Sequence, residues 1–163
     1  MEYSKETINN IKQIIYCIIL TNTWLLLMLI FSIFLIFINP YVGLNYLLVI
    51  IGFLFSTVGH ELFHLITIKK FKVKIHNISP SFTGVNISFN KTKYYKIIAI
   101  SGVMFNFTFL LFLTLILFTL NHINFLVGSI NILTLQILIT YNFILLFNIL
   151  PIFPDGKLYW SKY

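Results

Sequence analysis

The chain has 163 residues, of which 59% are hydrophobic and only 9% are charged, and its mean hydropathy is +0.95. Soluble domains carry about 25% charged residues, so this composition excludes an ordinary soluble domain and indicates a protein that crosses a membrane several times. The formal net charge of +7 comes from lysine alone, because the sequence contains no arginine. Arginine is the side chain most used to read bases, so we do not expect the chain to bind nucleic acid.

Four segments are long and apolar enough for membrane-spanning helices, each of which needs about 20 apolar residues. They cover roughly residues 14–38, 44–68, 97–120 and 125–150. The polar trio Thr21-Asn22-Thr23 interrupts the first segment, and Asn39-Pro40 ends it. We therefore divide the chain into an N-terminal part with the first helix, residues 1–43, and a three-helix core, residues 44–163.

The lysines predict how these helices are oriented. Seven of the eleven lysines fall between the second and third spans, in residues 69–96, and the others lie near the two ends of the chain. Lysine concentrates in cytoplasmic loops, so this segment and both termini are predicted to be cytoplasmic. All three lysine-bearing regions agree with four spans, and we expect a multi-pass integral membrane protein in contact with the lipid bilayer.

The segment between the second and third spans carries signals of β-structure. Residues 73–78 and 85–89 are rich in β-branched and aromatic side chains, and residues 79–84 between them contain proline, serine and glycine. A small β-hairpin is the favoured interpretation, and a polar loop is the alternative. The predicted fold class is an all-α polytopic membrane protein, with four transmembrane helices and a small cytoplasmic-side β-hairpin between the second and third.

The second predicted span contains the sequence His60-Glu61-Leu62-Phe63-His64. Residues four apart share a helix face, so the two imidazoles point the same way, while Glu61 lies about 100° around the helix. Two neutral imidazoles, a third protein ligand and an open position suit a catalytic Zn²⁺ ion. The ion would activate a water molecule, and Glu61 would accept its proton as general base. The alternative is a pair of ordinary helix histidines, which a carboxylate inside a membrane span disfavours.

Asp155 is the candidate for the third ligand, because it is the only aspartate in the chain. It follows the fourth span, where Pro151 and Pro154 must break the helix and free backbone groups. In the four-span topology, the ends of the second and fourth spans lie on the same side, so Asp155 can reach the depth of His64. The alternative is a solvated turn residue at a helix end.

With these motifs the chain resembles the site-2 protease family of intramembrane zinc metalloproteases. The resemblance covers about residues 44–156 and rests on three motifs. His60 to His64 is similar to the family's H-E-x-x-H, and Gly102 to Asn106 is similar to G-P-x-x-N with valine in place of proline. Asn148 to Gly156 is similar to N-x-x-P…D-G, although Pro154 stands one residue closer to Asp155 than is usual in the family.

The resemblance implies a zinc metalloendopeptidase that hydrolyses a peptide bond of a membrane-associated protein or small precursor peptide, within or beside the bilayer. It also implies that a sheet edge, here residues 85–89, pairs with the extended substrate. A catalytically silent relative that binds a peptide or partner is the alternative. The residues to which the resemblance assigns roles are the zinc ligands His60, His64 and Asp155, the general base Glu61, and the substrate-binding residues Asn148 and Asn106.

Overall fold

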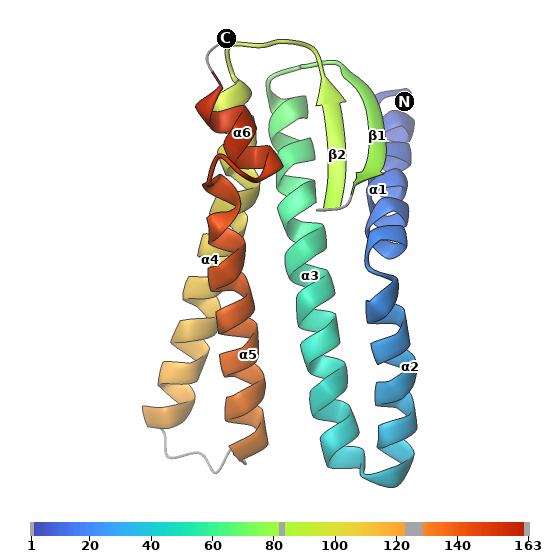
Figure 1. The fold of residues 1–163 in the computed structure, drawn as a ribbon, viewed down its shortest axis with the longest axis vertical. Helices are drawn as coiled ribbons and strands as arrows, with labels where there is room; N and C mark the ends of the chain where they lie inside the picture. The colour runs from blue at the N-terminus through green and yellow to red at the C-terminus, as the bar shows by residue number, and fades with distance from the viewer. Residues whose placement is uncertain (1, 82–83, 123–128, 162–163) are drawn as a thin grey trace.

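The computed structural model describes residues 2–81, 84–122 and 129–161. Its long helices form an elongated bundle, and a two-stranded antiparallel sheet lies beside one end of that bundle (Figure 1). In chain order the elements are α1 (Glu2–Thr21), α2 (Thr23–Ile38), α3 (Pro40–Lys70), β1 (Ile75–Ser81), β2 (Gly84–Phe89), α4 (Tyr95–His122), α5 (Ser129–Leu145), the 3₁₀ helix η1 (Leu146–Ile149) and α6 (Pro154–Trp160).

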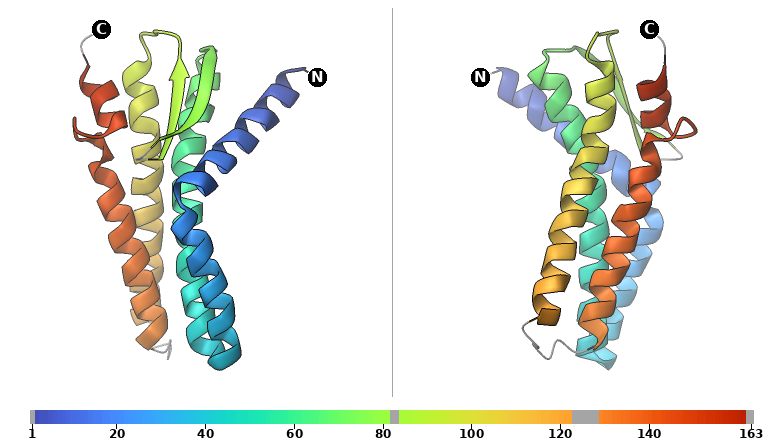
Figure 2. Two further views of the ribbon diagram at one scale, coloured as in Figure 1. Left: turned by 45° about the vertical axis from the view of Figure 1, so that its right-hand side comes forward. Right: turned by 90° about the vertical axis from the view of Figure 1, so that its left-hand side faces the viewer.

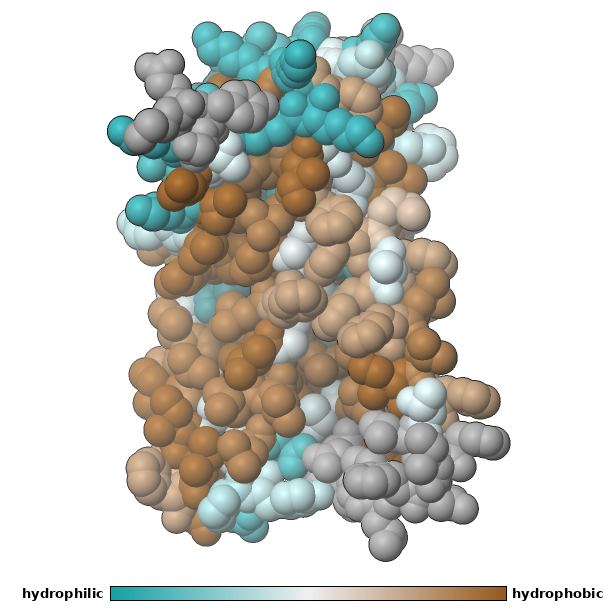
Figure 3. Space-filling view, turned by 180° about the vertical axis from the view of Figure 1, so that it is seen from behind, coloured by the Kyte–Doolittle hydropathy of each residue, from teal (hydrophilic) through white to brown (hydrophobic). Residues whose placement is uncertain are grey.

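The helices have the length and composition of membrane spans. Three stretches are long and apolar enough to cross a bilayer, and α1 with α2 forms a bent pair that would make a fourth. Seen from behind, apolar residues cover most of the middle of this face, and hydrophilic residues gather at the end that carries the hairpin (Figure 3). The structure therefore supports a helical membrane protein with three or four spans. The three stretches are Pro40–Lys70, Tyr95–Thr119 and Ile132–Trp160.

The first span differs from the single helix that we predicted over residues 14–38. The chain bends by 77° between α1 and α2, and α1 leaves the axis of the bundle (Figure 2). Asn22 sits at the break and uses both its backbone N–H and its side-chain amide to donate to the carbonyl oxygen of Ile18, each at 3.0 Å. The Thr21 and Asn22 side chains thus give additional hydrogen bonds to carbonyl groups in the last turn of α1, next to the bend.

The predicted β-hairpin is confirmed, but its turn is shorter than we expected. Ser79 and Pro80, which we placed in the turn, belong to β1 and lie opposite Asn86 and Val85 of β2. The strand therefore continues to Ser81, and the tip of the hairpin falls on residues 82–83, which lie outside the described residues. Proline fits here because a sheet tolerates it where its missing N–H would not face the partner strand.

Helix α1 holds the hairpin against α3. The side chains of Ile14, Cys17 and Ile18 form a buried cluster with Leu65 of α3 and Ile78 of β1. The side-chain amide of the neighbouring Gln13 donates to the carbonyl oxygen of Ile78 at 3.0 Å. Because α1 covers β1 in this way, the other edge of the sheet, formed by β2, is the one that faces the rest of the bundle.

The helical stretch that begins in α5 is interrupted near residue 150 and then continues toward the hairpin end, so that Ile132–Trp160 forms one candidate span. Helix α5 ends at Leu145, η1 follows, and α6 then packs against the start of α4, where the Tyr95 hydroxyl donates to the carbonyl oxygen of Ser161 at 2.8 Å. A Cβ atom at Gly156 would overlap the carbonyl oxygen of Leu150, so the tight turn between η1 and α6 requires glycine there. Asp155 consequently lies in the first turn of α6 and not in the non-helical segment that we predicted.

The start of α1, the hairpin and α6 all gather at the same end of the bundle (Figures 1 and 2). These are the three parts of the chain in which the lysines are concentrated. The bundle thus has one basic end; of the described residues, the α2–α3 connection, the end of α4 and the start of α5 lie at the opposite end.

We expect the buried cluster between α1 and the hairpin to be a main source of stability at this end. Ile14 is fully buried, whereas its neighbour Ile15 is 40% exposed on the outer face of α1. Ile14→Ala should lower the free energy of unfolding by about 2–4 kcal/mol, because it opens a cavity in a packed cluster. Thermal unfolding in detergent should show a clear drop for Ile14→Ala and little change for the control Ile15→Ala; equal effects would contradict the packing.

Candidate metal centre

Three side chains from two distant parts of the chain converge at the hairpin end of the bundle. The Nε2 atoms of His60 and His64 lie 3.2 Å apart, and the Oδ2 atom of Asp155 lies 2.9 Å from the first and 3.2 Å from the second. Ligands of a tetrahedral zinc ion lie about 3.3 Å from one another, given bonds of about 2.0–2.1 Å. The three atoms therefore have the spacing of one face of a zinc tetrahedron, and this group could hold a metal ion.

The hydrogen bond of His64 shows which ring nitrogen faces the site. Its Nδ1 atom lies 2.7 Å from the carbonyl oxygen of Ile98 in α4. A carbonyl oxygen only accepts, so Nδ1 must carry the proton and donate it. In the neutral ring, Nε2 then points a lone pair at His60 and Asp155, which is the tautomer that a metal ligand needs.

The chemistry of the donor set fits a metal ion. In their unprotonated states, two imidazole nitrogens and a carboxylate oxygen direct electron pairs at one point, where a bound cation offsets their mutual repulsion. All three side chains are largely removed from solvent, with 7% of His60, 8% of His64 and 21% of Asp155 exposed, so water screens this repulsion only weakly. Two histidines and a carboxylate suit zinc, and the same set also occurs in iron(II) sites.

Gly102 explains how α4 can pass close to these ligands. A Cβ atom at this position would lie 2.5 Å from Nε2 of His64 and 2.7 Å from Nε2 of His60. Such contacts are shorter than van der Waals separation, so any side chain here would occupy the space in front of the two ligand atoms. The glycine at the start of the Gly102–Asn106 motif thus keeps the ligand face open.

Glu61 is buried beside the ligands, with 9% of its surface exposed. The backbone N–H of Val85, at the start of β2, donates a hydrogen bond to its carboxylate. Glu61 also lines two cavities, one of about 420 Å³ toward the hairpin end and one of about 150 Å³ deeper in the bundle. The carboxylate therefore stands where the two cavities approach each other.

The larger cavity, which we call the outer cavity, lies between β2 and α6. Residues 85–89 of β2 form one wall, and Asp155, Lys157 and Leu158 of α6 contribute to the other. His64 and Glu61 lie in its lining. A molecule in this cavity would contact the strand edge and the ligand set at the same time.

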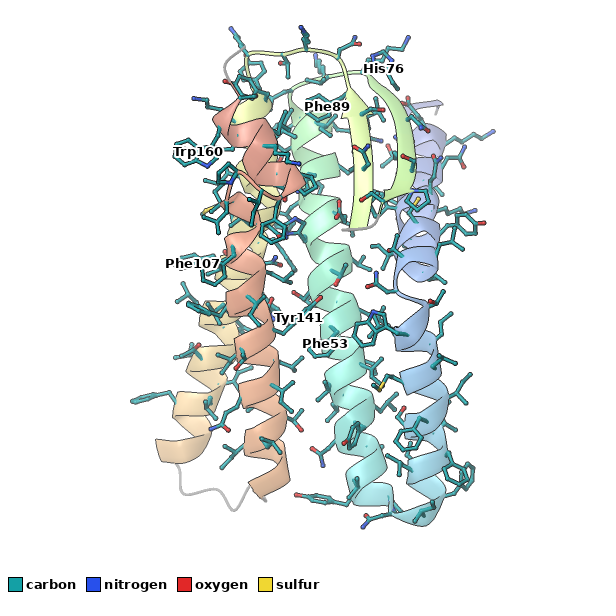
Figure 4. The ribbon with its side chains drawn as sticks, in the orientation of Figure 1. Phe53, His76, Phe89, Phe107, Tyr141 and Trp160 are labelled. Carbon is teal, nitrogen blue, oxygen red and sulfur yellow. The ribbon has the colours of Figure 1, made fainter. Side chains whose placement is uncertain are left out.

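The smaller cavity, which we call the inner cavity, is bounded mainly by polar side chains. Asn22 from the α1–α2 break, Thr57 of α3 and Tyr141 of α5 line it together with His60 and Glu61. The hydroxyl groups of Tyr141 and Thr57 are hydrogen-bonded at 2.9 Å. Figure 4 shows Tyr141 directed from α5 toward Phe53 of α3, and their ring centroids are 4.3 Å apart.

The two asparagines that the resemblance assigns to substrate binding occupy different environments. Asn148 lies in η1 and lines the inner cavity, within the neighbourhood of His60 and Glu61. Asn106 is fully buried, lies 2.9 Å from Nδ1 of His60 through its side-chain amide, and lines neither cavity. Asn148 thus borders a cavity, whereas Asn106 contacts the ring of His60.

Two residues next to the site were missed by the sequence reasoning. Ser56 and Asn142 are fully buried and hydrogen-bonded to each other at 2.6 Å, and Ser56 also approaches Asn106. Ser56 stands four residues before His60, so its position on the same helix face was a usable signal. Asn142 gave a weaker signal, because it is one of several polar residues in an otherwise apolar helix. His76 is exposed on the hairpin, away from the ligand set (Figure 4).

No protein-family model matches this chain, and no protein of known function or solved structure is detectably similar to it. The resemblance to site-2 proteases therefore rests on the three short motifs alone.

The metal site predicts a specific effect of Asp155→Ala. Removing the carboxylate leaves two imidazoles, so the metal content of the purified protein should fall from about one equivalent to near zero. Lys157→Ala, on the same short helix, is the matched control and should keep its metal. Elemental analysis after gel filtration measures both variants, and full metal retention in Asp155→Ala would contradict the ligand assignment.

A second prediction concerns the space in front of the ligands. Gly102→Ala places a methyl group against both Nε2 atoms, so it should reduce bound metal severely while the bundle stays folded. Gly52→Ala is the control, because its added methyl group would meet only the side chain of Leu138 at another helix contact. Metal content and circular dichroism together decide the point, since normal metal binding by Gly102→Ala would be incompatible with this geometry.

Proposed function

We propose that the chain is an intramembrane zinc metalloprotease of the site-2 protease type, which hydrolyses a peptide bond of a membrane-associated protein or small precursor peptide. The observation that carries the proposal is the convergence of His60, His64 and Asp155 beside Glu61, in a cavity walled by a strand edge. Buried ionisable groups at this depth are costly, so their arrangement around one point favours a functional site over a structural one.

The residues of the site have distinct tasks in this proposal. His60, His64 and Asp155 would hold Zn²⁺, which when bound would supply the Lewis acid that makes a water molecule and a peptide carbonyl reactive. Glu61 accepts a proton from the attacking water and later delivers it to the leaving nitrogen. The N–H of Val85 holds the Glu61 carboxylate in place and remains its hydrogen-bond donor before the proton arrives.

The edge of β2 is the candidate surface for binding the substrate backbone. The N–H of Val85 points to Glu61 and therefore away from β1. Backbone N–H groups alternate along a strand, so those of Ile87 and Phe89 also point away from β1, toward the outer cavity that both residues line. A peptide paired with this edge would be held extended, which is the conformation that a protease needs.

The two cavities suggest how the substrate passes the site. A peptide in the outer cavity lies against β2 and reaches Glu61, and the inner cavity begins on the other side of that carboxylate. Residues on one side of the cleaved bond would occupy the outer cavity, and the next residues would enter the inner cavity. The Asn148 side chain could hydrogen-bond a substrate carbonyl there.

We also propose that the site lies near the cytoplasmic side of the membrane, with four spans of which the first is bent. The lysine-rich regions support this orientation, because cytoplasmic loops are enriched in lysine and these regions gather at the hairpin end. Both termini would then be cytoplasmic, and a substrate would be cut close to the cytoplasmic boundary of the bilayer.

The function is tested with Glu61→Gln, which keeps the size of the side chain and removes its basicity. Purified protein in detergent is incubated with a panel of single-span peptides that contain glycine or proline within the span, and products are identified by mass spectrometry. The wild type should cleave at least one peptide, and Glu61→Gln should cleave it about 10²–10⁴-fold more slowly while keeping one equivalent of metal. Glu6→Gln, in the N-terminal turns of α1, is the matched control.

The outcomes separate the enzyme from its alternative. Cleavage by Glu61→Gln at the wild-type rate would reject Glu61 as the general base. A wild-type protein that contains no metal and cleaves none of the peptides would favour the catalytically silent, peptide-binding alternative.

A further inference from the structure

Directly behind the ligand set, two amide oxygens face a single serine hydroxyl, which has only one proton to donate. The hydroxyl oxygen of Ser56 is 2.6 Å from Oδ1 of Asn142 and 3.4 Å from Oδ1 of Asn106. Both amide oxygens only accept, but a serine hydroxyl has one proton and cannot donate to both. One of the two asparagine amides must therefore present its nitrogen to Ser56.

The side-chain amide of Asn106 is also placed in a way that conflicts with metal binding by His60. The Nε2 atom of His60 faces His64 and Asp155, and its Nδ1 atom lies 2.9 Å from the Asn106 amide nitrogen. If that nitrogen donates to Nδ1, a proton on a neutral ring must sit on Nε2, where it would block the metal. The oxygen and nitrogen of an asparagine amide are assigned from its partners, and exchanging them in Asn106 removes both conflicts together.

We propose that Ser56, Asn106 and Asn142 form a directional hydrogen-bond chain that fixes His60 in its metal-binding tautomer. Nδ1–H of His60 donates to Oδ1 of Asn106, whose amide N–H donates to the Ser56 hydroxyl oxygen. The Ser56 hydroxyl donates in turn to Oδ1 of Asn142. Ser56 and Asn142 are thus positioning residues, which act on the metal through Asn106 and His60. The inference rests on the metal site of the proposed function but not on peptide hydrolysis.

The direction of this hydrogen-bond chain is set at Asn142, the member farthest from His60. The Asn142 amide N–H donates to the carbonyl oxygen of Leu138 at 2.9 Å, which leaves Oδ1 of Asn142 as an acceptor. Ser56 must then donate to Asn142, so it can only accept from Asn106, and Asn106 can only accept from His60. A backbone carbonyl of α5 in this way determines the protonated nitrogen of a ring on α3, through a side chain of α4.

Burial makes this order rigid. The exposed fractions of Ser56, Asn106 and Asn142 are all 0%, so water does not reach them to offer alternative partners. Polar contacts between helices can also stabilise membrane bundles without any further role. A second buried contact between α3 and α5 provides a control for that effect. The hydroxyl of Thr134 in α5 donates to Oδ1 of Asn45 in α3 at 3.2 Å, and both residues are buried. That contact joins the same two helices as Ser56 and Asn142 do.

The test measures Co²⁺ affinity of the metal-free protein by the visible spectrum of the bound ion, with Ser56→Ala and the control Thr134→Ala. Loss of an interaction that orients a metal-binding histidine typically weakens metal affinity by about 10–100-fold. Ser56→Ala should therefore bind Co²⁺ about tenfold more weakly, because the Asn106 amide can then turn either way toward His60. Thr134→Ala should stay within about twofold of the native affinity, whatever its effect on thermal stability.

A rescue variant distinguishes orientation of His60 from general packing. In Asn106→Asp both side-chain oxygens accept, so Nδ1–H of His60 keeps its partner without help from Ser56. Ser56→Ala should then cost little Co²⁺ affinity in the Asn106→Asp background, whereas a packing defect would cost the same in both backgrounds.

The inference is overturned if Ser56→Ala and Thr134→Ala weaken Co²⁺ binding equally, or if native protein binds no Co²⁺. Cleavage is not measured in this experiment. If the expected Co²⁺ affinities were found without any peptide cleavage, they would support the hydrogen-bond chain and reject only the proposed protease.

Discussion

The structure depends on one contact, in which two imidazole nitrogens and a carboxylate oxygen are held within 3.2 Å of one another inside an apolar bundle. Each neighbouring element contributes to keeping these atoms together. Helix α3 places His60 and His64 one turn apart, and the break between α5 and α6 places Asp155 beside them. Gly102 leaves open the space that a side chain at this position of α4 would fill. A cation at the centre would turn the repulsion of the three atoms into the interaction that joins α3 to α6.

The polar groups around this centre are arranged in two layers with different properties. On the side of the outer cavity, Glu61 takes its hydrogen bond from the backbone of β2, and the strand edge continues into open space. Behind the ligands, Ser56, Asn106 and Asn142 are closed off from solvent and bonded to one another. The first layer borders the outer cavity, whereas the second can hold only one order of donors and acceptors. A site that both admits substrate and keeps its ligands fixed needs both properties.

The sequence was sufficient for the parts of the molecule that follow from periodicity and rare residues. The apolar runs predicted the long helices, alternating β-branched residues predicted the hairpin, and the spacing of His60 and His64 together with the single aspartate indicated the metal-binding group. The bend at Asn22 was visible only as a polar interruption, because whether a helix bends depends on the neighbour against which it packs. The position of Asp155 in the first turn of a helix and the hydrogen-bond chain behind His60 depend on contacts between helices, which no local pattern specifies.

The 77° bend at Asn22 takes α1 off the axis of the bundle and lets it hold the hairpin against α3. Helix α1 is amphipathic and angled away from the bundle, as in helices that lie along a bilayer surface, and Gln13 and Ile14 attach it to β1. Leu65 of α3, four residues after Glu61, belongs to the same buried cluster as Ile14 and Ile78. The helix that carries Glu61 and the hairpin that carries Val85 are therefore held together by α1. The bend thus fixes the strand edge relative to the metal-binding group.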